Sequence, residues 1–236
     1  MSRSRLTVTV GLVTLVQALM MIAPLAILGP AIDWPASLDL PSAEVLPLIG
    51  QAADDVRLGY GLYLAYSLAW AVVGPALAWA LLDPGRRDSP LFTVSVAVIG
   101  LSALARAIGI LRWLSASPEL AAQYEGADPA AAQTLAIVQG AINDWGGAIG
   151  EYIGVAILTS IWLVCLSLLI IAHRQVPRWL GWAGLVVAPL LASPAGELFG
   201  WPASIFVSTV VFHLWLFVVA RSEERRVGKE CRSSCR

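Results

Sequence analysis

The chain has 236 residues, of which 58% are hydrophobic and only 13% are charged. Its mean hydropathy of +0.76 is too high for a water-soluble domain of this size. The formal net charge of −1 says little, because it averages two opposite surfaces. We therefore predict an all-α, polytopic transmembrane helical bundle of about six spans. We expect the lipid bilayer as its partner, and no nucleic acid.

Six apolar stretches of roughly 20 residues or more are long enough to cross about 30 Å of hydrocarbon. The first is too long for the apolar core of a signal peptide, so we predict an uncleaved anchor, which Pro24 and Pro30 kink or end. A proline-rich acidic loop follows, with room for a short helix near 43–53. The predicted spans are 6–29, 58–82, 91–114, 144–172, 179–199 and 203–220.

The segment before the fourth span is too long for one simple crossing. We predict an interfacial helix over about 129–142, followed by the span that begins near Asp144. A single long helix that projects beyond the bilayer is the alternative. The Pro84-Gly85 pair predicts a turn between the second and third spans. Ser117-Pro118-Glu119 predicts a helix start in the acidic segment after the third span.

The loops between these spans alternate in charge. The N-terminus and the loops at 83–88 and 173–178 carry arginines, whereas the loops at 30–56 and 115–133 are acidic. Arg57 is the one exception. Arginine-rich loops are retained in the cytoplasm. The pattern therefore predicts a multi-pass membrane protein with both termini cytoplasmic.

Residues 221–236 differ in composition from the rest of the chain. They contain the only lysine and two of the three cysteines, and 221–233 resembles the translation of a common sequencing adapter. We therefore treat 221–236 as an artefactual tail and exclude it from functional reasoning. The remaining cysteine, Cys165, lies in an apolar span and is read as a packing residue.

Ionisable residues inside a span are costly unless they are paired, so each is a candidate for function. Arg106 and Arg112 lie in the outer part of the third span, and Asp144 and Glu151 lie at matching depths in the fourth. We predict that Arg106 and Glu151 make the closer contact. This pair either fixes the packing of the two helices or serves a ligand or a proton.

Two further features lie near the same depth. Tyr60, Tyr63 and Tyr66 of the second span share a helical stripe, which either faces the bundle or forms an interfacial aromatic belt. His213 is predicted in the middle of the sixth span, where a hydrogen-bonded core histidine is favoured over a proton carrier or metal ligand. Glycines 146, 150 and 154 recur every four residues, a spacing that permits close helix packing.

No catalytic motif, metal site or cofactor site is predicted, so enzymatic activity stays uncertain and is not favoured. The leading hypothesis is a small transport or sensing module for an external small molecule or proton. The second is a structural or interaction subunit, and the third an integral-membrane enzyme. Six spans make a narrow bundle for a wide pathway, so association into a homo-oligomer is left open.

Three segments carry a resemblance to a known family. They are 106–113 at the end of the third span, Gly150-Glu151-Tyr152-Ile153-Gly154 in the fourth, and 177–184 at the start of the fifth. In these the chain resembles a domain-of-unknown-function family of bacterial six-helix integral membrane proteins. The resemblance covers most of 6–220. It implies an inner-membrane location and no established activity.

Overall fold

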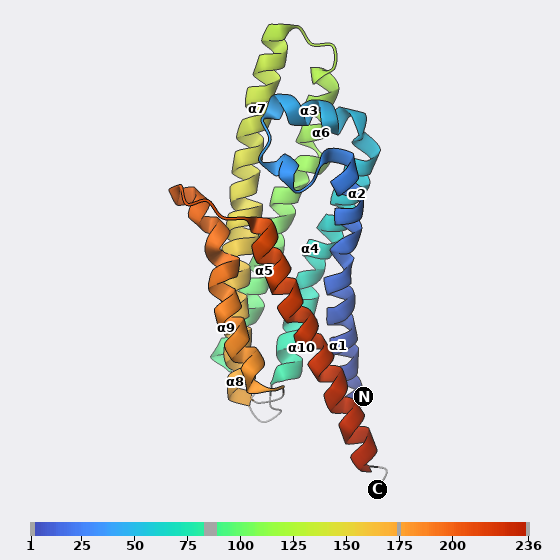
Figure 1. Ribbon diagram of the computed structural model, residues 1–236, viewed down its shortest axis with the longest axis vertical. Helices are drawn as coiled ribbons and strands as arrows, with labels where there is room; N and C mark the ends of the chain where they lie inside the picture. Colours follow the sequence, from blue (N-terminus) through green and yellow to red (C-terminus); the bar gives the residue numbers. More distant parts are fainter. Residues whose placement is uncertain (1–2, 83–88, 174–175, 235–236) are drawn as a thin grey trace.

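The computed structural model describes residues 3–82, 89–173 and 176–234, with side chains described over 9–82, 89–173 and 176–221. Long helices run side by side along the longest axis of the molecule (Figure 1). The turn expected at Pro84-Gly85 and the basic residues Arg86, Arg87 and Arg174 lie outside the described residues.

The predicted apolar stretches are helical over nearly all of their described length. Short 3₁₀ turns at Ala36–Leu38 and Ser193–Phe199 (η4) accompany the main helices. The helices are α1 (Arg3–Met20), α2 (Ile22–Ile32), α3 (Ser42–Gln51), α4 (Ala53–Leu81), α5 (Pro90–Leu114), α6 (Ala116–Tyr124), α7 (Pro129–Gly147), the π-helical η3 (Ala148–Leu158), α8 (Thr159–His173), α9 (Arg178–Ala192) and α10 (Ile205–Ser234).

Within the described residues, five helices are long and apolar enough to cross a membrane. The protein is therefore a multi-pass membrane protein in contact with the lipid bilayer. The apolar part of α10, Ile205–Arg221, is shorter than these five. The five helices are Thr9–Ile32, Ala53–Leu81, Pro90–Tyr124, Pro129–His173 and Arg178–Phe199.

The helix that contains the predicted fourth span is continuous from Pro129 to His173. The break expected between an interfacial helix at 129–142 and a span from Asp144 is absent, so the single long helix is the correct alternative. Its 45 residues extend over about 65 Å, twice the thickness of the hydrocarbon core. Asp128 begins the helix by accepting hydrogen bonds from the amides of Ala130 and Ala131.

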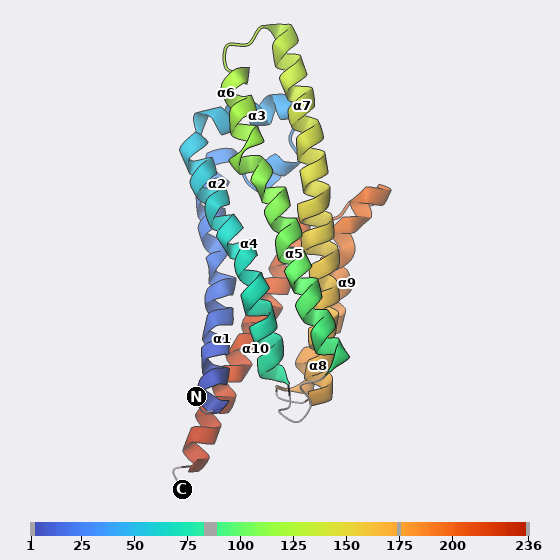
Figure 2. The same cartoon turned by 180° about the vertical axis from the view of Figure 1, so that it is seen from behind.

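The projecting part of this helix packs with α3 and α6 at one end of the bundle. We call this the acidic end, because the carboxylates of the 33–55 and 119–128 segments belong to it. Figures 1 and 2 show α3, α6 and the start of α7 together at this end, and both chain ends at the opposite one. The short helix α3 lies within the segment where the sequence leaves room for one.

Two hydrophobic cores stabilise the molecule. One fills the bundle around Trp70, Trp162 and Phe212. The other lies at the acidic end, where Leu46, Ile49 and Trp113 are buried with residues of α2 and α4. Met21 and Tyr63 pack against both cores.

Candidate functional site

The site is built around a close crossing of α5 and η3. A β-carbon on Gly109 would lie 2.7 Å from the α-carbon of Gly150 and 2.8 Å from the carbonyl oxygen of Gly146. On either side of this point, Gly146 faces Arg112 and Gly154 faces Arg106. The glycines at four-residue spacing therefore form the surface on which α5 packs. They leave both arginines folded against the neighbouring helix.

Arg112, and not Arg106, forms the ion pair with Glu151. Nη2 of Arg112 lies 2.7 Å from Oε1 of Glu151, and Nη1 donates to the carbonyl oxygen of Gly109 at 3.1 Å. Arg112 also lies over the ring of Trp113, with Cζ 5.5 Å from its centroid. The prediction that Arg106 makes the closer contact with Glu151 is therefore wrong.

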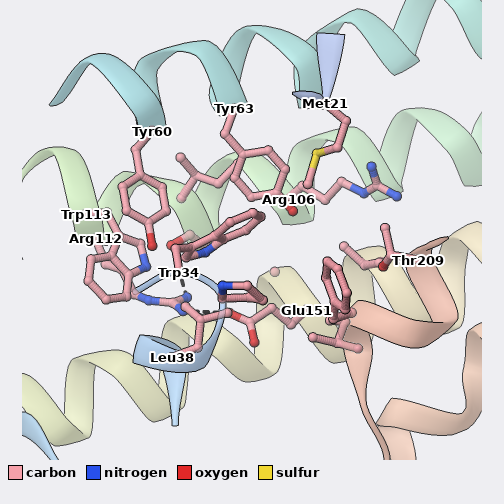
Figure 3. Close-up of a pocket in the computed structure, with 17 residues that line it drawn as sticks. Met21, Trp34, Leu38, Tyr60, Tyr63, Arg106, Arg112, Trp113, Glu151 and Thr209 are labelled. Atoms are coloured by element: carbon pink, nitrogen blue, oxygen red, sulfur yellow. Dashed lines mark hydrogen bonds and ion pairs between the residues drawn. The ribbon is translucent and has the colours of Figure 1, made fainter. Parts of the chain in front are cut away.

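The direction of the side chains explains this difference. Helical side chains point toward the N-terminus of their own helix. The two helices run in opposite directions, so Arg112 reaches inward from the acidic end while Glu151 reaches outward to meet it. Arg106 extends away from Glu151, deeper into the bundle. Figure 3 shows the two arginines extending to different parts of the site, with Glu151 joined to Arg112.

The guanidinium of Arg106 lies among neutral groups. The side chain is 4% exposed, and its Nη2 donates to the hydroxyl of Thr159 at 2.8 Å. Ser102 and Thr159 both donate to the carbonyl of Gly154, in the π-helical turn. Nε of Arg106 has no hydrogen-bond partner, and no carboxylate in the described part of the chain forms an ion pair with this arginine.

A cavity of about 60 Å³ separates Arg106 from the Arg112–Glu151 pair. Its walls are mainly apolar or aromatic. Few groups in it can therefore form hydrogen bonds or ion pairs with the guanidinium of Arg106. This volume holds a few water molecules or one small ion. We call it the inner cavity. Figure 3 shows its principal walls, which include Met21, Trp34, Leu38, Tyr63, Arg106, Glu151 and Thr209.

Deeper in the bundle, Tyr66 and His213 form a hydrogen-bonded pair. Nδ1 of His213 lies 2.7 Å from the carbonyl oxygen of Thr209, which can only accept. Nδ1 therefore carries the proton, and Nε2 accepts from the Tyr66 hydroxyl at 2.8 Å. Both residues line a space of about 10 Å³ that also borders Arg106. His213 is thus a hydrogen-bonded histidine inside the bundle.

The tyrosine stripe of α4 faces the interior of the bundle. Tyr60 and Tyr66 are 1% and 2% exposed. Tyr60 stacks on Trp113 at 4.8 Å between centroids, and Tyr63 packs edge-on against Trp34 at 5.7 Å. Tyr63 lines the inner cavity directly. The hydroxylated residues of this stripe are therefore positioned beside Arg106 and Arg112.

Toward the acidic end, two wider depressions adjoin the inner cavity, with which they share Leu38 and Glu151. Their volumes are about 440 and 590 Å³. Asp144 is exposed in the first, beside Arg112 and Glu151. Asp39 lies in both and Glu197 in the second. We call these four carboxylates (Asp39, Asp144, Glu151 and Glu197) the acidic rim.

Two carboxylates of the rim interact with neighbouring groups. Tyr152 donates to Oε2 of Glu197 at 2.6 Å. Desolvation raises the pKa of the Asp39 carboxyl above its usual value, and the nearby Glu197 carboxylate raises it further. In the described part of the chain, no group of three or more His, Cys, Asp or Glu side chains could hold a metal ion.

Residues 9–220 match a family described as Domain of unknown function (DUF4386). The chain belongs to the DUF4386 family. The match covers α2 to α9 and the apolar part of α10, and it ends directly before the segment that resembles a translated adapter. No curated protein and no solved structure matches the chain.

Three residues of the DUF4386 site are not among those the sequence singled out. Ser102 and Thr159 surround the Arg106 guanidinium, and Thr209 lines both cavities beside it. Ser102 precedes Arg106 by four residues and so shares its helical face, which is a usable signal. Thr159 and Thr209 come from other helices, and no local pattern connects them with Arg106.

Proposed function

We propose that this DUF4386 protein is a small transport or sensing module of the bacterial inner membrane. Its acidic end faces outward, and the inner cavity is its ligand site. In the proposed topology α10 is the sixth crossing and both termini are cytoplasmic. The charge of the loops supports this orientation, because the described ends of the helices that flank the arginine-rich segments at 83–88 and 173–178 lie at the end opposite α3 and α6.

One observation carries the proposal: a cavity reaches a buried arginine that has no ion-pair partner among the described residues. A contact that only fixes helix packing is dry and fully paired. Arg106 instead borders open space and has no ion-pair partner among the described residues. Retaining an unneutralised charge inside a membrane protein costs several kcal/mol, which a purely structural role does not offset. A ligand that contacts Arg106 supplies the missing interaction.

Glu151 and Arg112 have a different part in this proposal. Glu151 is shared by the inner cavity and both outer depressions, so its side chain lies on the path between them. The ion pair with Arg112 holds that side chain in place. We assign the pair to closing the inner cavity, and Arg106 to the ligand. This replaces the Arg106–Glu151 pair that the sequence predicted.

Cysteine labelling tests whether the inner cavity opens outward. In a chain with Cys165, Cys231 and Cys235 replaced by alanine, Thr209→Cys places a thiol of similar size on the cavity wall. We expect a small, charged, membrane-impermeant thiosulfonate to label it in intact cells. Reagent that reaches this thiol only from the cytoplasmic side of inverted vesicles would contradict the proposal, and so would complete protection in a folded protein.

Ser208→Cys is the matched control for this experiment. Ser208 is adjacent to Thr209 in α10, is 4% exposed, and does not line the inner cavity. Its thiol should stay unlabelled until the protein is denatured. Equal labelling of the two variants would mean that the reagent reaches α10 by general loosening of the bundle.

The second candidate function is that of a structural subunit, and the Arg112–Glu151 contact favours it. This pair is short, is mostly buried, and lies beside the glycine crossing of α5 and η3. A lock of this kind accounts for the contact between Arg112 and Glu151. It does not explain the inner cavity or the position of Arg106. The labelling of Thr209→Cys separates the two functions, because a structural lock needs no open cavity.

A further inference from the structure

The charge balance around Arg106 indicates what kind of ligand the inner cavity takes. The guanidinium is buried, and its hydrogen-bonding neighbour Thr159 is a neutral hydroxyl. The ion pairs of the described residues join Arg57 with Asp54 and Arg112 with Glu151, which leaves Arg106 without a counter-charge. A buried charge of this kind is stabilised when an ion of opposite sign reaches it.

The size and lining of the inner cavity restrict that ion. About 60 Å³ excludes large organic anions, and one arginine balances one negative charge. Met21, Val155 and Ile205 form apolar walls of this cavity and offer no hydrogen bonds to a strongly hydrated ion such as phosphate or sulfate. A halide or a short carboxylate with an apolar end suits these walls.

We propose that Arg106 binds a small monovalent anion, of the short-chain carboxylate or halide class, in the inner cavity. This inference rests on the proposed function, whose ligand it specifies. The unpartnered Nε and the remaining Nη protons supply the charged donors. Thr209 and Tyr63 line the same space and supply hydroxyls to it.

The acidic rim opposes anions, but its effect on the bound ion is small compared with that of Arg106. Three of its four carboxylates (Asp39, Asp144 and Glu197) lie in the wide outer depressions, where salt screens their charge over about 8 Å at physiological ionic strength. Glu151 is neutralised by Arg112. The interaction with Arg106 takes place in the low-dielectric interior, where the same charges interact several times more strongly. The rim therefore slows entry without cancelling binding.

Thermal unfolding in the presence of added anions tests the proposal. The protein is held in nanodiscs of zwitterionic lipid in potassium gluconate, whose anion is too large for the inner cavity. Sodium acetate and potassium chloride are then added in separate arms. We expect one of them to raise the apparent Tm by about 5 °C at saturation, since a ligand that binds only the folded state stabilises it. The arm that responds identifies the class.

Arg106→Gln should abolish the response, and Arg57→Gln is the matched control. Arg57 is an exposed arginine near the acidic end, and its loss should leave the response intact. Since Arg106→Gln could fail to fold, a second measurement keeps Arg106 in place. The responding anion should slow thiosulfonate labelling of Thr209→Cys severalfold, because both occupy the inner cavity.

The outcomes distinguish the two proposals. If the Thr209→Cys thiol is labelled from outside but neither acetate nor chloride changes the Tm, the proposal of a bound anion is wrong and the proposed function stands. An unlabelled thiol with no response overturns both. A rise in Tm that appears only when anionic lipid is present in the nanodisc also overturns the free-anion ligand, since the charge then comes from a lipid headgroup.

Discussion

At the scale of single residues, the site depends on which hydrogen-bond and ion-pair partners the two arginines of α5 have. Arg112 has a carboxylate, a backbone carbonyl and an aromatic face as neighbours. Arg106 donates to the hydroxyl of Thr159, and Tyr66 and Thr209 line the small space beside it. Hydrogen bonds to charged groups contribute more than neutral ones, and leaving a buried charged donor unpaired costs more again. The hydrogen bond to Thr159 therefore helps to hold the Arg106 guanidinium in place.

Replacing Thr159 by valine should lower the stability of the protein. The change preserves shape but removes the oxygen that accepts from Arg106 and contacts Ser102. We expect a loss of about 1–3 kcal/mol in the free energy of unfolding. For a chain of this length that corresponds to a fall of about 5 °C in apparent Tm. Thermal unfolding of the purified protein, followed by tryptophan fluorescence, measures it.

Ser167→Ala provides the comparison on the same helix. Ser167 is fully buried in α8, and its hydroxyl has no hydrogen-bond partner. Its removal relieves an unsatisfied group and should leave the apparent Tm unchanged or slightly higher. If Thr159→Val and Ser167→Ala gave the same Tm, the bond between Arg106 and Thr159 would contribute nothing to stability.

At the scale of elements, the crossing of α5 and η3 sets the spacing of the whole site. The backbones touch at Gly109 and Gly150, so neither helix has room for a β-carbon there. The crossing falls within the π-helical segment Ala148–Leu158, which also contains Glu151 and Gly154. π-Helical turns widen the helix and are frequent at functional sites. Here the segment carries the groups that meet both arginines.

Gly109→Ala should push the two helices apart. Its β-carbon would lie within 3.0 Å of backbone atoms of Gly146 and Gly150, which cannot move as a flexible side chain can. We expect a destabilisation of about 1–3 kcal/mol, typical of overpacking. The apparent Tm of the purified variant measures it. The labelling rate of Thr209→Cys in the same background should rise, because separation of the helices enlarges the inner cavity.

Gly100→Ala on the same helix is the matched control. No atom lies within 4 Å of the position that its β-carbon would take. Alanine is favoured over glycine in a helix interior by about 1 kcal/mol, so this variant should be as stable as the parent or more so. A loss of stability of equal size in both variants would show that α5 tolerates no alanine at all, and would remove the evidence for a specific crossing.

The elements were more predictable from the sequence than the site. Hydropathy and loop charge predict the apolar helices closely, because a bilayer demands long apolar helices wherever it is crossed. The Arg112–Glu151 pair was missed because matching residues by depth ignores the direction in which side chains extend. The break expected before Asp144 is absent from the structure. Apolar length alone does not reveal that a helix continues beyond the length of one crossing.

At the scale of the whole molecule, the site lies between the core of the bundle and the core of the acidic end. Met21 and Tyr63 contact both cores and also line the inner cavity. The continuous helix Pro129–His173 runs through both parts, which ties the cap formed by α3 and α6 to the bundle. The segment that leads into the cap also covers the site. Trp34 and Leu38, which precede α3, form two walls of the inner cavity.

The chain crosses the membrane five or six times, depending on whether α10 is a crossing helix. Its apolar part, Ile205–Arg221, falls at the lower limit of length for a crossing helix. It nevertheless buries Phe212, Leu216 and Val219 in the core of the bundle, and its side chains at Thr209 and His213 belong to the site. A helix that packs in this way beside five crossing helices has the same lipid environment on its outer face, so we expect it to cross as well.

Fusions of alkaline phosphatase and of green fluorescent protein test this topology. Alkaline phosphatase folds only outside the cytoplasm, and green fluorescent protein gives signal only inside it. We expect phosphatase activity for fusions after residues 122 and 201, and fluorescence for fusions after residues 86 and 221. Residues 201 and 221 flank α10, so a matching signal from those two fusions would mean that α10 does not cross. Equal cytoplasmic signal at residues 86 and 122 would contradict the crossing of α5 and, with it, the outward position of the acidic end.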